Sequence, residues 1–304
     1  MRTFKDIKYL PLRAKRNTFD QRVTTMDWVL FALLFIYGLI IIYPFYNAFL
    51  ISISPDKVYN ETPFLFFPKQ VTWDHYRTVF TGTNGEKLMS GLKVTLVLLF
   101  VGTLYQLFFT VITGYALSRN KWLGKNFVMN MILVTMFFGG GIIPYFQLIS
   151  KLGLYDTFGV LIIPGAIDTY NMLLMRNYFA SLPPDLEESA KIDGANDIQI
   201  FFKVYLPMSL PMLATIGLFF AVGNWNSWYN TMLFTENPDY KTLQYALREV
   251  IRNGSSQDES NQQAVISEGF KMASVFFTII PMMCFYPFLQ RFFVKGLVVG
   301  AIKG

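Results

Sequence analysis

The side chains that most often perform catalysis or bind metals are scarce in this sequence. Among its 304 residues there is one histidine, His75, and one cysteine, Cys284. A single thiol excludes an internal disulfide and a multi-cysteine metal site, and we expect Cys284 to be a small core residue. A lone imidazole is a poor metal or proton-transfer site, so we expect His75 to have a surface or docking role. A membrane enzyme would therefore have few catalytic groups to work with.

Signals for nucleotide binding are missing as well. No G-x-x-x-x-G-K-S/T string occurs, and Gly139, Gly140 and Gly141 lie inside an apolar run rather than after a strand. The sequence thus predicts no ATP site and no cofactor bound by this chain.

A polar segment between two apolar runs has the most informative spacing. Two prolines and three carboxylates predict a helix start, because proline suits the first turn and carboxylates are stabilised there by the helix dipole: Pro183, Pro184, Asp185, Glu187 and Glu188. Gly194 predicts the end of this helix, since glycine readily adopts the left-handed conformation, and Asn196 or Asp197 would cap the next helix. We expect a helix-turn-helix unit, whereas composition alone favours a solvated connector.

Small and aromatic side chains follow within the same unit. Three small residues permit the close approach of another surface, namely Ser189, Ala190 and Ala195. The aromatic rings of Phe201, Phe202 and Tyr205 offer apolar area that we expect to hold the second helix in place.

The order of residues in this segment resembles the EAA signature of ABC-importer permeases. In that signature a glutamate and two small residues precede a glycine and a later Ile-x-Leu-Pro. The matching residues here are Glu188, Ser189, Ala190, Gly194, Val204, Leu206 and Pro207. Ser189 replaces the usual alanine and Val204 the usual isoleucine, and neither change alters size or polarity enough to prevent docking.

The resemblance implies that residues 181–207 form a cytoplasmic coupling loop that docks on an ATPase subunit. Glu188 would pair with a basic residue of the ATPase, and Gly194 would allow the turn. The implied coupling residues are Glu188, Ser189, Ala190, Asp193, Gly194, Ala195, Leu206 and Pro207. The implied partners are a second permease subunit forming a heterodimer, two ATPase subunits that carry ATP and Mg²⁺, and an extracytoplasmic solute-binding protein.

Four other strings are similar to carbohydrate permeases of the maltose type. They are Gly114 to Arg119, the glycine-rich end from Phe293 to Gly304, and the pair of strings Pro164 to Phe179 and Gly223 to Trp228. The last pair is most similar to permeases for oligosaccharides or polysaccharides, which implies such a cargo.

Polar residues inside apolar runs indicate where a substrate could pass, because ionisable groups within a span usually face a cavity or the bundle interior. The candidates are Asp168, Tyr170, Asn171, Asn224, Trp225, Asn226, Trp228 and Tyr229. Amides and amphipathic rings suit a polyhydroxylated ligand. A helix cap or interhelical hydrogen bond is an equally good interpretation of Asp168, and an interfacial aromatic belt is the alternative for the tryptophan-rich group.

Composition and the length of the apolar runs predict the helices that position these residues. The chain is 53% hydrophobic and 15% charged, against about 45–50% and about 25% in an average soluble domain. Runs long enough to span the bilayer occur near residues 28–53, 94–117, 127–149, 158–180, 208–234 and 272–294. We therefore expect an all-α polytopic membrane protein with six transmembrane helices, and the resemblance implies the type I ABC-importer permease fold over residues 28–304.

Charge predicts the orientation of these spans. Residues 1–27 form a basic tail with seven lysines and arginines, and Arg119, Lys121 and Lys125 fall on the same side. The positive-inside rule places both termini in the cytoplasm of a multi-pass protein in contact with lipid, and the resemblance implies the cell membrane of a bacterium. The net charge of +6 forms no basic stripe, so we expect no nucleic-acid partner. A secondary transporter or channel for a small polar solute is the alternative function.

Overall fold

The computed structural model describes residues 25–61, 66–119, 123–253 and 266–301, with side chains up to residue 285. The chain divides into a first unit, residues 1–48, and a second unit, residues 49–304. The described part of the first unit is almost entirely helix α1 (Thr25–Ser52). The basic residues expected between positions 1 and 24, and the side chains of the glycine-rich C-terminal string, lie outside the described residues.

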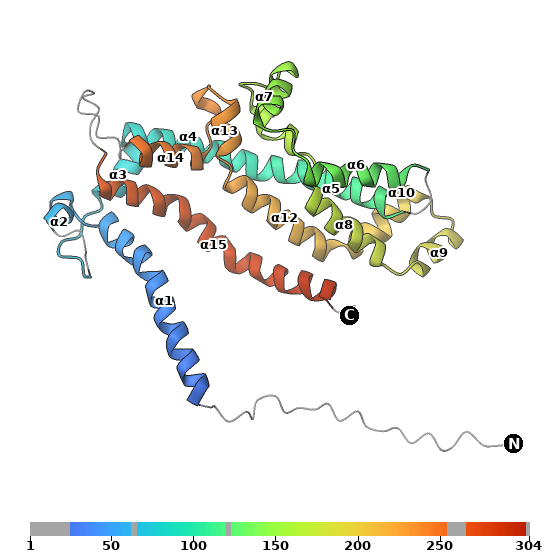
Figure 1. The fold of residues 1–304 in the computed structure, drawn as a ribbon, viewed down its shortest axis with the longest axis horizontal. Coiled ribbons are helices and arrows are strands. Elements are labelled where there is room, and N and C mark those ends of the chain that lie inside the picture. The colour runs from blue at the N-terminus through green and yellow to red at the C-terminus, as the bar shows by residue number, and fades with distance from the viewer. Residues whose placement is uncertain (1–24, 62–65, 120–122, 254–265, 302–304) are drawn as a thin grey trace. The chain divides into compact units, whose positions relative to one another are not determined.

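The second unit is built from helices in the part of the chain that the structure describes (Figure 1). Its first half contains α2 (Asp56–Glu61), α3 (Asp74–Thr81), α4 (Thr83–Val97), the π-helix η1 (Leu98–Gly102), α5 (Thr103–Ser118), α6 (Lys125–Phe137) and α7 (Ile142–Lys151). Its second half begins with η2 (Phe158–Leu161), η3 (Ile163–Gly165), α8 (Thr169–Ser181), α9 (Asp185–Ile192), α10 (Asp197–Ile200), the π-helix η4 (Phe201–Tyr205) and α11 (Leu206–Met208). The remaining elements are α12 (Leu210–Trp225), α13 (Tyr229–Phe234), η5 (Pro238–Tyr240), α14 (Leu243–Asn253) and α15 (Glu268–Ala301).

Among the described residues, three helices are long and apolar enough to cross a membrane, and three bent pairs would raise the number to six if each pair were one span. The long helices cover Thr25–Ser52, Thr83–Ser118 and Glu268–Phe285. The helix Thr83–Ser118 combines α4, η1 and α5 into 36 residues, or about 54 Å at 1.5 Å per residue. Since the hydrocarbon core is about 30 Å thick, this helix also extends well beyond it.

Two of the bent pairs lie within expected spans, and the third joins the expected coupling loop to the span that begins near residue 208. The pair Lys125–Phe137 and Ile142–Lys151 bends by 120° across three consecutive glycines, of which Gly141 has φ +85°. The expected run 127–149 is therefore two helices, because glycine there leaves the helical conformation freely. The pairs Phe158–Gly165 with Thr169–Ser181 and Asp197–Met208 with Leu210–Trp225 bend by 42° and 75°.

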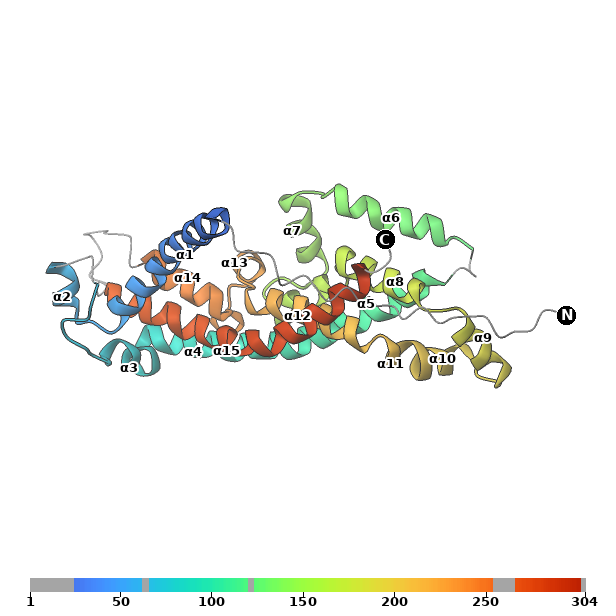
Figure 2. The same cartoon turned by 90° about the horizontal axis from the view of Figure 1, so that it is seen from below.

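Helix α5 is the centre of one packed bundle. It lies against α8 and α12, as both views show (Figures 1 and 2). A Cβ added at Gly114 of α5 would lie 3.2 Å from the Arg176 backbone nitrogen and from Met175. In lipid, helix association depends on such close packing, so Gly114 in the Gly-Tyr-Ala-Leu-Ser-Arg string lets α5 and α8 approach each other.

A second apolar cluster lies where α3, α4, α12, α14 and α15 pack together. Its buried side chains include Val79, Leu88, Trp225, Leu243 and Phe270, one from each of these helices in that order. Gly91 of α4 faces α14, because a Cβ there would lie 3.0 Å from the backbone of Leu243. The two helices therefore meet through main-chain contact at this position.

Replacing Gly91 with alanine is expected to destabilise the protein although alanine is the better helix former. The added methyl group would push against backbone atoms of Thr242 and Leu243, which cannot rotate away. Overpacking of this kind costs about 1–3 kcal/mol. Thermal unfolding in detergent measures the effect, and Gly223→Ala is the matched control because a Cβ on this α12 glycine meets nothing within 4 Å. Equal melting temperatures for the two variants would contradict the contact.

Two loops of this unit are joined by one carboxylate. Asp156 Oδ1 accepts hydrogen bonds from the backbone N–H groups of Glu236 and Asn237, both at 2.8 Å. These two bonds hold the pKa of the Asp156 carboxyl below its usual value. The loop after α7 is thereby fixed to the loop after α13.

Candidate coupling surface and substrate path

Helix α9 ends in a complete Schellman motif. Gly194 has φ +80° and donates its N–H to the Lys191 carbonyl at 3.0 Å. Ala195 donates its N–H to the Ala190 carbonyl at 2.9 Å, and both alanines pack on the same apolar cluster. This is the pattern of backbone bonds and apolar contact that closes a helix at a left-handed residue. The structure confirms that Gly194 ends the first helix of the loop.

The next helix begins with a capping box. Asn196 Oδ1 accepts from the Gln199 N–H at 2.9 Å, and Gln199 Oε1 accepts from the Asn196 N–H at 3.0 Å. Of the two caps expected from the sequence, Asn196 is the one used. Two opposed caps within a few residues fix the angle between α9 and α10, which supports a helix-turn-helix unit rather than a loose connector.

One side of this loop exposes apolar side chains. Ile192 is 86% exposed, Ile198 68% and Phe202 60%. We call five exposed residues of α9, α10 and η4 the loop surface: Leu186, Glu188, Ile192, Ile198 and Phe202. Phe201 and Tyr205 pack in the apolar cluster as expected, whereas Phe202 lies outside that cluster, exposed, with its ring edge-on to Phe201 at 4.9 Å. An exposed apolar group rimmed by polar residues is typical of a surface that binds a partner.

The other expected coupling residues are either exposed or half-buried against the bundle. Ser189, Asp193, Gly194 and Pro207 are exposed. Ala190, Ala195 and Leu206 are half-buried against the cluster around α5, α8 and α12. The structure therefore brings the residues matched to the EAA signature onto one unit.

The sequence analysis missed the role of Glu187, which it treated only as a helix-start carboxylate. Glu187 is buried, with 8% of the whole residue exposed, whereas Glu188 beside it is exposed. Glu187 forms ion pairs with Arg119 and Lys191, and Tyr205 donates a hydrogen bond to it at 3.3 Å. Only the i, i+4 spacing of Glu187 and Lys191 signalled part of this cluster in advance.

Asp168 caps a helix in this structure. Its Oδ1 accepts from the Asn171 N–H at 2.8 Å at the start of α8. Asn171 is buried and the Tyr170 side chain is 55% exposed. The geometry supports the cap that the sequence left open as one alternative, and Asp168 and Tyr170 are the exposed members of this candidate group.

The candidates Asn224 and Trp225 are buried by other helices. Asn224 Nδ2 donates to Thr103 Oγ1 at 3.1 Å and to Gln106 Oε1 at 3.0 Å, which links α12 to α5. Trp225 is 4% exposed and belongs to the cluster that contains α14 and α15. Asn224 is therefore engaged between helices, and Trp225 exposes only a small part of its surface.

Asn226 instead borders a hollow of about 230 Å³ between α12, α14 and α15. Gln244 and Thr278 add polar atoms, and Gln244 Nε2 donates to Asn226 Oδ1 at 3.4 Å. Ile279, Met282 and Met283 make up the apolar wall together with Trp225. Two amides and a hydroxyl over an apolar wall suit a ring that has both hydroxyl groups and apolar faces.

A cation lies next to this hollow. The guanidinium carbon of Arg248, one turn after Gln244 on α14, is 4.1 Å from the centre of the Trp228 ring. Arg248 is exposed, and no carboxylate among the described residues forms an ion pair with it. Tyr229 is 47% exposed and packs edge-on against Trp228, with ring centres 5.6 Å apart. The exposed candidates Asn226 and Tyr229 and the half-buried Trp228 thus lie near one exposed arginine.

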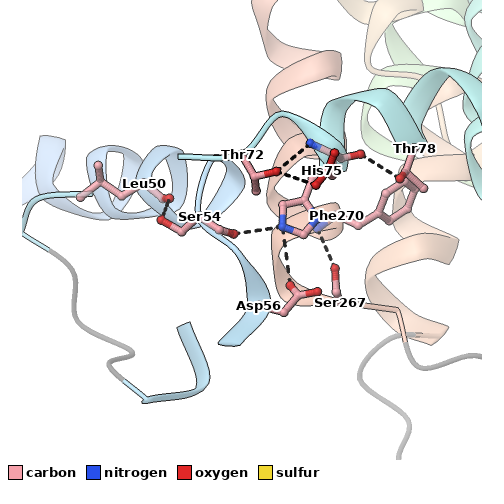
Figure 3. A network of polar contacts seen from close by, with 9 residues as sticks. Leu50, Ser54, Asp56, Thr72, His75, Thr78, Ser267 and Phe270 are labelled. Carbon is pink, nitrogen blue, oxygen red and sulfur yellow. Dashed lines mark hydrogen bonds and ion pairs between the residues drawn. The ribbon is translucent and has the colours of Figure 1, made fainter. Parts of the chain in front are cut away.

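A polar network fills the end of the unit near α3 (Figure 3). His75 Nε2 donates to the Ser54 carbonyl at 3.0 Å and lies 3.6 Å from Asp56 Oδ1. A Cβ at Gly269 would lie 2.2 Å from the same nitrogen, so the imidazole packs directly on the backbone of α15. His75 is 8% exposed and is not the surface residue that the sequence suggested. A hollow of about 620 Å³ lies beside it.

Comparison with known proteins agrees with this geometry. Residues 94–299 match the family model described as "Binding-protein-dependent transport system inner membrane component". The protein LplC of Bacillus subtilis (strain 168) is 36% identical over 88% of this chain and 91% of its own length. The polygalacturonan/rhamnogalacturonan transport system permease protein YtcP of the same strain is 33% identical over 91% of this chain and 98% of its own.

A solved structure matches as well. It is a chain from a bacterial ABC transporter involved in the import of the acidic polysaccharide alginate, with a TM-score of 0.82 and 31% identity. The match covers 90% of this chain and 99% of that one. The family model covers more than half of the chain, and the helices, the bent pairs and the capped loop are consistent with it. This chain therefore belongs to the family of binding-protein-dependent transport system inner membrane components.

Proposed function

We propose that this chain is one of two permease subunits in an ATP-driven importer for oligosaccharides or polysaccharide fragments. The observation that carries the proposal is the loop surface, where an exposed carboxylate, Glu188, lies among exposed apolar side chains on a doubly capped unit. Such a surface fits a cleft on an ATPase subunit, because the apolar side chains would be removed from water and Glu188 would pair with a cation.

The proposed complex contains this chain, a second and different permease subunit, two ATPase subunits and an extracytoplasmic solute-binding protein. ATP and Mg²⁺ would bind on the ATPase subunits. The chain would lie in the cell membrane of a bacterium with both termini in the cytoplasm, which places α9 and α10 on the ATPase side. ATP binding would shift the permease pair between inward-facing and outward-facing conformations through the loop surface.

The proposed cargo is an acidic saccharide. Asn226 and Gln244 offer amides to sugar hydroxyls, and the Arg248 guanidinium offers paired N–H donors to a carboxylate. Stacking on Trp228 holds the guanidinium in place without using its hydrogen-bond donors. The polygalacturonan permease and the alginate importer named above support the same class of cargo.

ATP-driven uptake by the whole complex in proteoliposomes tests this proposal, with trigalacturonate and a neutral oligosaccharide as the two probes. We expect trigalacturonate to enter, and Arg248→Gln to raise its KM by about tenfold, because a hydrogen bond to a charged group contributes about 1.5–3 kcal/mol. Arg252→Gln, which removes the same charge one turn later on α14, is the control and should leave uptake unchanged.

The outcomes separate the cargo from the transport function. Uptake of the neutral probe alone, or of trigalacturonate with the same KM after Arg248→Gln, would contradict the acidic cargo and leave the permease assignment standing. Absence of ATP-dependent uptake of either saccharide class by the complete complex would contradict the proposed importer itself.

A further inference from the structure

Two neighbouring carboxylates of α9 differ in their surroundings. Glu188 belongs to the exposed loop surface, whereas Glu187 is buried against the end of the membrane bundle. Lys191 Nζ lies 2.5 Å from Glu187 Oε1, and Arg119 and Tyr205 contact Oε2. The same helix turn therefore exposes the Glu188 carboxylate and holds the Glu187 carboxylate in contacts within this chain.

Arg119 connects this carboxylate to the long helix that contains α5. It is the first residue after α5, and its guanidinium carbon lies 5.6 Å from the centre of the Tyr115 ring and 4.9 Å from that of Tyr205. Arg119 also donates a hydrogen bond to the Tyr205 hydroxyl. The side chains of Arg119 and Glu187 are 23% and 11% exposed, so water screens this pair only weakly.

A proline pair precedes α9 and a Schellman turn follows it, and both are held by backbone hydrogen bonds and small apolar contacts. Pro183 and Pro184 donate no backbone N–H, and Gly194 touches nothing within 4 Å of where its Cβ would be. The Ala190 and Ala195 contacts with the apolar cluster are small. Among the described contacts, the Arg119–Glu187 pair is the charged, directional one that joins α9 to α5, and α5 packs along α8 and α12.

We propose that the Arg119–Glu187 ion pair is the positioning link through which movement of the coupling loop becomes movement of α5. The proposal rests on the function proposed above, in which an ATPase moves α9. Glu188 would bind the ATPase and Glu187 would transmit the displacement to the long helix. Without the pair, α9 can follow the ATPase while α5 stays behind.

Transport per ATP hydrolysed is the quantity that distinguishes a link from a merely structural contact. In the reconstituted complex, Arg119→Gln and Glu187→Gln are each expected to lower this ratio by about tenfold while the ATPase subunits still co-purify. Arg119→Lys and Glu187→Asp keep the charges and should recover most of it. Asp185→Asn removes another carboxylate from the first turn of α9, and is the control that should leave the ratio unchanged.

A double variant tests whether the two residues act through each other. Arg119→Gln with Glu187→Gln should be no worse than either single change, because both remove the same interaction. An unchanged ratio in the single variants, multiplied losses in the double variant, or loss of the co-purifying ATPase would overturn the link. The wild-type complex is measured in parallel, so a failure of ATP-driven uptake there counts against the proposed importer instead.

Discussion

Glu188→Arg is expected to abolish ATP-driven uptake while the chain still inserts into the membrane. The exposed carboxylate lies among apolar side chains of the loop surface, so a partner that covers them would also enclose the charge. Reversing an enclosed charge leaves it unpaired and facing a cation, which costs about 2–5 kcal/mol and weakens docking by about 30-fold or more. Co-purification of the ATPase subunits and uptake in proteoliposomes measure the two consequences.

The matched control for this change is Asp185→Arg. Asp185 is also an exposed carboxylate in the first turn of α9, so the net charge and the helix dipole change equally. We expect this variant to retain most of its uptake. Undiminished uptake by Glu188→Arg, or equal losses in both variants, would contradict the assignment of Glu188 to the docking surface.

Gly194→Val is expected to reduce uptake by more than tenfold. Gly194 has φ +80°, where a side chain costs about 1–2 kcal/mol and a β-branched one more. Nothing lies within 4 Å of an added Cβ, so the loss would come from backbone strain and not from a clash. Opening the Schellman motif would move α10 away from α9 and divide the loop surface.

Gly194→Asn separates conformation from size at this position. Asparagine is similar in size to valine but tolerates the left-handed region, so its uptake should stay within about twofold of wild type. Equal loss in both variants would show that bulk at the turn, and not its backbone conformation, limits docking. The exchange of the loop's backbone amide protons reports the conformation directly.

Family membership decides between the functions that the sequence had left open. Composition and span count alone were also compatible with a secondary transporter or channel. The family match over residues 94–299 and the 0.82 TM-score to a chain of an ABC importer support a permease subunit instead. The cargo, the partners and the orientation in the membrane stay proposals, which the uptake experiments address.

The conformation of the coupling loop was largely predictable because it depends on neighbours in sequence. A glycine after a helix and an asparagine three residues before a glutamine form their bonds within one turn, so their spacing alone predicts the motifs at Gly194 and Asn196. The interruption at Gly139–Gly141 has an equally local cause, although the apolar run around it concealed the bend.

The partners of single polar side chains depended on contacts far apart in sequence. Asn224 bonds residues about 120 positions away, which removes it from the surface, and His75 is buried between Ser54 and Gly269. No periodicity distinguishes such residues from exposed ones, because every polar group in an apolar run needs some partner.

The sequence by itself determined an all-helical membrane protein, a capped loop of two helices and a family resemblance carried by Glu188 and Gly194. Only the tertiary structure decided which of two adjacent glutamates faces outward. That choice follows from Arg119 at the end of α5, whose charge is half-buried between two tyrosine rings and is offset by Glu187. A charge removed from water needs a partner nearby, and the fold brings that partner from 68 positions away in the sequence.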